Sequence, residues 1–241
     1  MKTALFIRTF DGDLEWLKLC LRSVRHFCVG WDEIIVCSDG TGAKALEYAA
    51  EHGFQTQLDC EAGSIEDGYI AQQATKLRAD KFVGEDIEVI SFIDSDCLVT
   101  GTWTPESLFT DDHITYLCTP WSECPDAEKA WRWVTANLIG KDSQYEFMRR
   151  QPMTYLRDTL TRARNWLVVE KQMPLLDFLG KQMAFSEFNF LGAWAFEHEP
   201  YLYHWVDTIK ETWDHLPVRQ FWSHGKPDKE EAAKIVEEML S

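Results

Sequence analysis

The sequence of 241 residues predicts an α/β fold in which helices flank a mostly parallel sheet. Apolar runs at residues 3–10, 33–37 and 89–93 have the length and composition of buried strands, and a short strand is expected near residues 54–58. Between them, apolar residues recur three and four positions apart, which is typical of amphipathic helices. Since strands and helices alternate, we expect helical crossovers that join parallel strands.

The helices of the first half follow from caps and spacing. Asp11 or Asp13 caps the first helix, because the residues that follow share one buried stripe (Leu14, Leu17, Leu21, Val24 and Cys28). After a turn at residues 38–42, a second helix is expected over 43–52 and a third over 68–79. The pattern is therefore two βα units, a third strand and a further helix before the strand at 89–93.

Three polar residues fall at the carboxyl ends of these strands. They are Thr9, Asp39 and Asp94. The carboxyl ends of parallel strands share one edge of the sheet, which is where ligands bind in such folds. We therefore expect a ligand site at this edge.

The composition changes after Pro105, where Trp and Arg become frequent and clear strands become scarce. We interpret residues 106–241 as a helical lobe added to residues 1–105 within a single domain. Its expected helices are 126–138, 153–167 and 228–240, and its candidate strands are 184–190 and 201–206.

Charge and cysteine usage exclude several classes of protein. The formal net charge of −16 argues against nonspecific binding to nucleic acid. The seven cysteines form no CxxC pair, which indicates neither a zinc ribbon nor a disulfide framework. The apolar start of the chain is cut short at Arg8, and no stretch approaches the length of a membrane span. We expect a cytoplasmic protein without a transmembrane segment.

One local exception to the acidic character is a group of arginines. Five of them fall within sixteen residues of one another: Arg149, Arg150, Arg157, Arg162 and Arg164. The favoured interpretation is a helix with a solvated basic face, and the alternative is a basic patch that binds a ligand.

The strongest chemical signal is Asp94-Ser95-Asp96 at the end of the fourth strand. Two carboxylates two residues apart, released from a buried strand, supply the hard oxygen ligands that Mg²⁺ or Mn²⁺ prefers. The alternative is a surface turn in which Asp serves turn geometry. Apolar Ile93 and Leu98 flank the pair closely, and this favours the metal site because buried carboxylates need a cation or donors.

This segment resembles the DxD motif of GT-A glycosyltransferases, which follows a βαβαβ nucleotide-binding half. Residues 34–41 resemble the second strand of that family and its Asp-Gly turn, and residues 68–77 resemble the helix before the DxD strand. The resemblance implies a GT-A-like, Rossmann-type sheet. It also implies that the nucleotide sugar contacts Thr9, Asp39, Gln72, Gln73, Lys76, Asp94 and Ser95.

Two later segments add to the resemblance. Residues 221–227 are similar to a His-Gly-x-Lys-Pro segment in the glycogenin-like branch, although Gly225 and Lys226 are closer together here. The resemblance implies that His224 joins Asp94 and Asp96 as a metal ligand and that Lys226 meets the diphosphate.

Ser186-Glu187-Phe188 resembles a Ser-Glu-Phe segment of GT-A-like proteins, on the acceptor side. This placement makes Glu187 the candidate base for an acceptor hydroxyl. Alternatively, Glu187 pairs with a nearby arginine or caps a turn. His204 ranks lower, as a core or stacking residue.

These features predict a glycosyltransferase that depends on Mn²⁺ or Mg²⁺ and uses a nucleotide-sugar donor, with UDP-sugars favoured. The acceptor is expected to be a small molecule, a glycan or a glycolipid, with modified DNA left open. Three alternatives remain: a haloacid-dehalogenase-type phosphatase, a nucleotidyltransferase that uses the Asp94 and Asp96 pair, and a noncatalytic carbohydrate-binding module.

Overall fold

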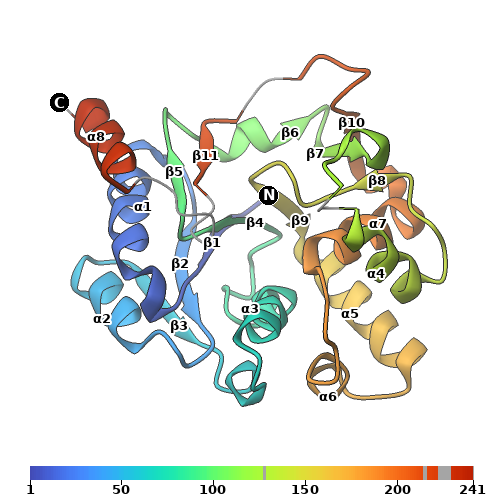
Figure 1. Ribbon diagram of the computed structural model, residues 1–241. Helices are drawn as coiled ribbons and strands as arrows, with labels where there is room; N and C mark the ends of the chain where they lie inside the picture. The colour runs from blue at the N-terminus through green and yellow to red at the C-terminus, as the bar shows by residue number, and fades with distance from the viewer. Residues whose placement is uncertain (127–128, 214–215, 222–228, 241) are drawn as a thin grey trace.

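The computed structural model describes residues 1–126, 129–213, 216–221 and 229–240 (Figure 1). Its central sheet has the strand order β3-β2-β1-β4-β9. The strands are β1 (Thr3–Arg8), β2 (Glu33–Ser38), β3 (Gln55–Leu58), β4 (Val89–Asp94) and β9 (Met153–Leu156). All neighbours pair in parallel except β9, which runs antiparallel to β4. The predicted α/β fold with a mostly parallel sheet is confirmed.

Three helices cover the two faces of this sheet, as Figure 1 shows. They are α1 (Leu14–Phe27), α2 (Ala43–Glu51) and α3 (Gly68–Leu77). Successive residues of a strand face opposite sides. Thus Leu5 and Ile7 of β1 pack with α1 and α2, whereas Ala4 and Phe6 pack in the cluster that contains α3.

The second half adds further strands and helices beside the sheet. A second sheet has the order β10-β7-β6 with β8 paired to β7, and β11 pairs with β5. The strands are β5 (Cys97–Val99), β6 (Phe109–Thr110), β7 (His113–Pro120), β8 (Tyr145–Glu146), β10 (Tyr203–Asp207) and β11 (Val218–Gln220). The helices are α4 (Ala130–Ile139), α5 (Arg157–Lys171), α6 (Leu175–Leu179), α7 (Glu187–His198) and α8 (Lys229–Leu240).

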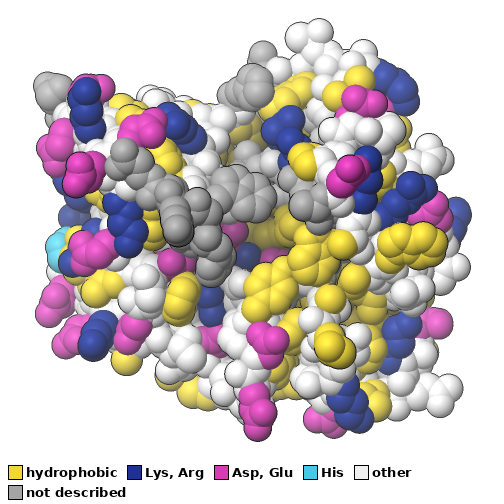
Figure 2. Space-filling view, in the orientation of Figure 1, with side chains coloured by type: hydrophobic (Ala, Val, Ile, Leu, Met, Phe, Trp, Pro, Cys, Tyr) yellow, Lys and Arg dark blue, Asp and Glu magenta, His cyan; other side chains and the backbone are white. Residues whose placement is uncertain are grey.

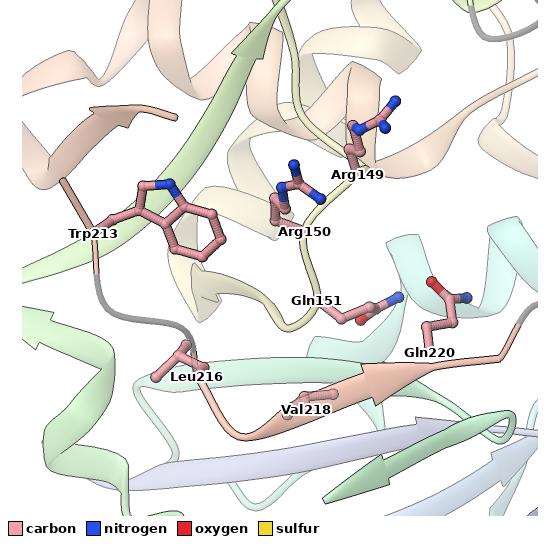
Figure 3. A pocket seen from close by; sticks show the side chains of 7 residues that line it. All are labelled: Arg149, Arg150, Gln151, Trp213, Leu216, Val218 and Gln220. Carbon is pink, nitrogen blue, oxygen red and sulfur yellow. The ribbon is translucent and has the colours of Figure 1, made fainter. Parts of the chain in front are cut away.

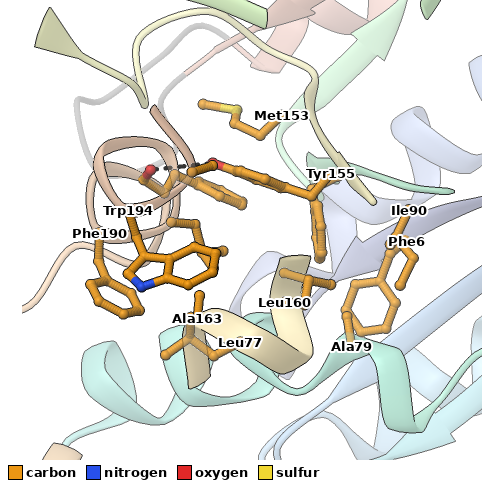
Figure 4. Packing of buried hydrophobic residues seen from close by; sticks show 14 of the residues in the cluster. Phe6, Leu77, Ala79, Ile90, Met153, Tyr155, Leu160, Ala163, Phe190 and Trp194 are labelled. Atoms are coloured by element: carbon orange, nitrogen blue, oxygen red, sulfur yellow. Dashed lines mark hydrogen bonds between the residues drawn. The ribbon is translucent and has the colours of Figure 1, made fainter. Parts of the chain in front are cut away.

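The largest core cluster joins the two halves (Figure 4). Phe92 of β4 packs against Phe188 of α7, with ring centroids 5.5 Å apart. Tyr155 of β9 stacks on the same Phe188 ring and donates a hydrogen bond to its carbonyl oxygen. Because aromatic pairs of this kind bury large apolar areas, they hold the start of α7 against β4 and β9.

Two predictions for the second half were wrong. Residues 184–190 were expected to form a strand, but α7 begins at Glu187, and every residue of its first two turns is buried. A helix buried on all sides has no polar face, so its periodicity cannot be told from that of a buried strand. Residues 153–156 form β9 rather than the start of a helix, and α5 follows at Arg157 without a break.

No helix in the described part of the chain combines the length and the hydropathy that a membrane span requires.

Asp80, just after α3, ties that region to α5. Its carboxylate accepts hydrogen bonds from Thr161 and from Arg164, both at 2.7 Å, and its carbonyl oxygen accepts one from Arg157 at 3.0 Å. Burial alone raises the pKa of Asp80, but the bonds from Arg164 and Thr161 outweigh burial and lower it. The ion pair therefore stabilises the folded chain at neutral pH.

We predict that Asp80→Asn lowers the free energy of unfolding at pH 7 by about 3 to 5 kcal/mol, because it leaves Arg164 buried without its counterion. The folded-state pKa of Asp80 lies below its unfolded value, so this stability is present above the unfolded value and is lost as the pH falls through the folded value. Urea denaturation of both proteins from pH 7 down to pH ~3 should show the difference shrinking.

Asp86→Asn is the control, because Asp86 pairs with Lys2 on the surface. Exposed ion pairs contribute little, so this variant should unfold at nearly the same urea concentration as the wild type. An Asp80→Asn variant as stable as the control would contradict a stabilising role for the buried pair.

Candidate functional site

The site lies where the strand order reverses. The chain builds β2 and β3 on one side of β1 and then places β4 on the other side. The last residues of the two strands, Arg8 and Asp94, are partners in the β1–β4 register. A crevice at such a reversal is the usual ligand site of open α/β sheets.

A cavity of about 700 Å³ opens at this point. Its walls come from the end of β1, α3, the turn between β4 and β5, residues 148–151, the start of α7, and β11. In Figure 2 the middle of this face is hollowed, and hydrophobic side chains gather along one side of the hollow. The volume falls within the range that holds a small molecule or cofactor.

The two carboxylates of the Asp94-Ser95-Asp96 turn converge in this cavity. The Gln220 amide nitrogen lies 3.4 Å from Asp94 Oδ2 and 3.3 Å from Asp96 Oδ1. Gln151 donates a further hydrogen bond to Asp94 Oδ2 at 3.3 Å, and the Ser95 hydroxyl donates to Asp13. One donor therefore sits within reach of both carboxylates.

This arrangement fits a hard divalent cation, because oxygens of two carboxylates already face one shared donor. Among the described residues, no group of three His, Cys, Asp or Glu side chains is placed to hold a metal ion. His224 and Lys226, predicted as metal ligand and diphosphate contact, lie outside the described residues. Phe221 is described, and its N–H donates to the Asp96 carbonyl oxygen at 3.0 Å.

Lys76 of α3 connects the carboxylates. Its Nζ lies 2.6 Å from Asp94 Oδ1 and 3.0 Å from Glu187 Oε1, and its side chain is almost fully buried. Burial by itself lowers the pKa of Lys76, but Asp94 and Glu187 together outweigh burial and raise it. Lys76 is therefore an ammonium ion at neutral pH, and it holds β4 and α7 at one point.

Gln73 and Glu187 meet at the start of α7. The Gln73 side-chain oxygen accepts the Glu187 N–H at 3.1 Å, and its amide donates to the Tyr69 carbonyl at 3.2 Å. Since the first N–H groups of a helix lack intrahelical partners, Gln73 satisfies one of them and fixes the position of Glu187. Both Gln73 and Glu187 line the cavity.

Two of the predicted nucleotide-sugar contacts, Thr9 and Asp39, do not face the cavity. Thr9 and Asp39 are fully buried and are not among the residues that line the cavity. Asp39 forms an ion pair with Arg8, whose guanidinium also donates to Gln72 at 3.4 Å. Arg8 and Gln72 do line the cavity, so Asp39 acts on it through Arg8.

Among the cavity residues that sequence reasoning missed are Arg8, Gln151 and Gln220, whose side chains hydrogen-bond to other residues of the site. Arg8 could have been recognised from the sequence, because a charged residue within a strand buried on both faces is almost always paired with a counterion. Gln151 and Gln220 carried no such signal. The loop before β9 and the pairing of β11 with β5 bring them to the carboxylates.

A smaller pocket of about 210 Å³ adjoins the cavity (Figure 3). Gln151 and Gln220 line both spaces. In Figure 3 their side chains point toward one another, while Arg150 extends from the same loop toward Trp213. The remaining lining residues are Arg149, Leu216 and Val218.

The structure divides the five clustered arginines into two sets. Arg157, Arg162 and Arg164 bind carbonyl oxygens or carboxylates of the fold. Arg149 and Arg150 precede β9 and line the smaller pocket. The interpretation of a single helix with a basic face was therefore wrong, because two of the five residues lie on a loop.

Comparison with known proteins gives a match of structure alone. No family model and no curated protein matches the sequence. The structure is similar to that of an active-site mutant of LgtC, with 13% identity and a TM-score of 0.58 over 98% of this chain and 95% of that one.

It is equally similar to the galactosyltransferase LgtC in complex with donor and acceptor sugar analogs. That match has 14% identity and a TM-score of 0.58, and it covers 99% of this chain and 96% of the other. At such identities the likeness establishes the fold and nothing finer. The chain has a GT-A-like fold, as the DxD segment and the βαβαβ pattern predicted.

Proposed function

We propose that this chain is a glycosyltransferase that moves a sugar from a nucleotide-sugar donor, with UDP-sugars favoured, to an acceptor hydroxyl. The observation that carries the proposal is the convergence of Asp94 and Asp96 on one point of a cavity at the strand reversal. The GT-A-like fold supports it, since the likeness to LgtC extends over nearly the whole chain.

In this proposal Asp94 and Asp96 hold Mn²⁺ or Mg²⁺, with His224 as a further ligand. Such a cation, when bound, offsets the negative charge that builds on a diphosphate leaving group. Lys226 is proposed to meet the same diphosphate. Ser95 lies between the two carboxylates on the cavity wall.

The wall formed by α3 and β1 is proposed to hold the nucleotide part of the donor. Arg8 brings a fixed positive charge, because the buried Asp39 carboxylate orients its guanidinium. Gln72 accepts from Arg8 and lines the same wall. A cation held in place before a ligand arrives needs little reorganisation when an anion binds, which favours a diphosphate or phosphate oxygen here.

We assign Glu187 to the acceptor side. In the transfer step the acceptor oxygen forms a bond to the anomeric carbon, the bond from that carbon to the diphosphate oxygen breaks, and the hydroxyl proton passes to Glu187. Glu187 and Asp94 both contact the Lys76 ammonium, at 3.0 and 2.6 Å. The proposed proton acceptor and the proposed metal ligand therefore both lie next to the Lys76 ammonium, on the wall of one cavity.

We predict that Mn²⁺ is needed for tight UDP binding and that Asp96→Asn removes this dependence. Isothermal titration of UDP with and without Mn²⁺ should give at least tenfold tighter binding with metal in the wild type, a difference of about 1.4 kcal/mol. In the variant, the two affinities should agree within about twofold, because a metal-ligand oxygen has been replaced by an amide.

Asp112→Asn serves as the control, since it removes an equal charge from an exposed turn between β6 and β7. A metal effect that survives in Asp96→Asn would overturn the ligand role of Asp96. GDP-, ADP- and CMP-sugars tested beside UDP-sugars decide the preferred base. If no nucleotide binds with or without metal, the transferase proposal fails.

We predict that Glu187→Gln slows turnover by about 10² to 10⁴, the usual contribution of general base catalysis, because an amide cannot accept the proton. The measurement is UDP release from UDP-sugars, with water or a simple sugar as acceptor. Glu197→Gln is the matched control, because Glu197 lies on the same helix and is exposed.

Turnover of Glu187→Gln at the wild-type rate would contradict the assignment of the base. Equal thermal unfolding temperatures of the two variants would show that a loss of rate is not a loss of fold. Release of inorganic phosphate from a simple phosphomonoester, without UDP release, would instead favour a phosphatase that uses Asp94 and Asp96.

A further inference from the structure

The smaller pocket beside the cavity is built by a fixed loop. Met148 and Arg149 donate their backbone N–H groups to the buried Glu146 carboxylate at 2.7 and 2.9 Å, and Phe147 donates to Asn189 of α7 at 2.9 Å. These bonds anchor the loop that carries Arg150. Its guanidinium is thereby presented by a part of the chain attached to α7, the helix that begins with Glu187.

Arg150 is a cation without a counterion among the described residues. Its guanidinium forms no ion pair with a described carboxylate, and its buried Nε has no hydrogen-bond partner in that part of the chain. Its Cζ lies 5.7 Å from the centre of the Trp213 ring. A buried donor that is left unsatisfied costs free energy, so the pocket favours a ligand with an acceptor oxygen.

The positive charge of Arg150 stands out from the rest of the chain, which carries a net charge of −16. The acidic surface as a whole repels anions, whereas a cationic pocket attracts them locally. Guanidinium groups bind phosphate and carboxylate oxygens in a bidentate manner, and an aromatic ring accommodates the apolar face of a sugar. Trp213, Leu216 and Val218 supply that apolar wall.

We propose that the acceptor is an anionic sugar, whose phosphate or carboxylate group binds Arg150 while its ring lies against Trp213. This inference rests on the proposed transferase function. The donor diphosphate is assigned to Asp94 and Asp96, and Gln151 and Gln220 stand between that site and the smaller pocket. A sugar anchored in the pocket reaches past these two amides into the cavity that Glu187 lines.

The test is isothermal titration of the wild-type chain saturated with UDP and Mn²⁺. The probes are glucose, galactose and N-acetylglucosamine, each compared with its 6-phosphate, and glucose and galactose compared with their uronic acids. We expect at least one anionic sugar to bind tenfold or more tightly than its neutral parent. The phosphate and uronate arms distinguish the two sources of negative charge. If no anionic sugar shows this preference, the proposal is overturned.

Arg150→Gln should reduce the preference to within about twofold while the affinity for UDP with Mn²⁺ stays at the wild-type value. Arg219→Gln is the matched control. Arg219 lies between two pocket-lining residues of β11, faces the other side and pairs with Glu231 at 3.0 Å. It removes the same charge close by and should keep the preference. An equal loss in both variants would indicate a general charge effect and overturn the proposal.

The two proposals fail separately. If UDP does not bind with Mn²⁺, the transferase function is lost, and the same sugar titrations without nucleotide still decide whether Arg150 selects anions. If UDP binds and the neutral and anionic sugars bind alike, the transferase function stands and the anionic acceptor is refuted.

Discussion

A single buried ammonium ion holds the site together. Lys76 contacts Asp94 at the end of β4 and Glu187 at the start of α7, and it packs 4.9 Å from the centre of the Phe188 ring. Two carboxylates near one another in a desolvated wall would repel, and the ammonium between them offsets this. The ammonium thus links the end of β4 in the sheet to the start of α7 in the added lobe.

The remaining contacts of the site build outward from this link. Gln73 lies one turn before Lys76 on α3 and receives the first N–H of α7, so the same helix positions both ends of the contact. Gln220 and Gln151 approach the other side of Asp94. The carboxylate of Asp94 thus serves as the meeting point of α3, β11 and the loop before β9.

The sequence allowed the parallel half of the fold to be predicted, because its strands are continuous apolar runs and its helices have a clear polar face. The Asp94 and Asp96 pair was recognisable for the same reason, since it interrupts such a run. The lobe was harder to predict. Around Phe188 and Phe190 polar and aromatic residues alternate as in a strand, yet both kinds are buried, so only the tertiary surroundings decide that the segment forms α7. The contacts of Gln220 arise from the antiparallel pairing of β11 with β5, which lies far away in the sequence: Gln220 and Asp96 are 124 positions apart, and no local pattern encodes such a contact.

The register of the central sheet has a consequence for how the site tolerates change elsewhere. Arg8 and Asp94 face each other only because every earlier pair of β1 and β4, from Thr3 and Val89 onward, is in step. Both strands are buried on their two faces, so a slip of one residue would turn all their side chains to the wrong layer. The register of β1 and β4 therefore fixes the position of the sheet edge that bears the carboxylates. That position is set by apolar residues far from any ligand, and a core substitution that shifts β4 along its axis would displace the carboxylates without altering them.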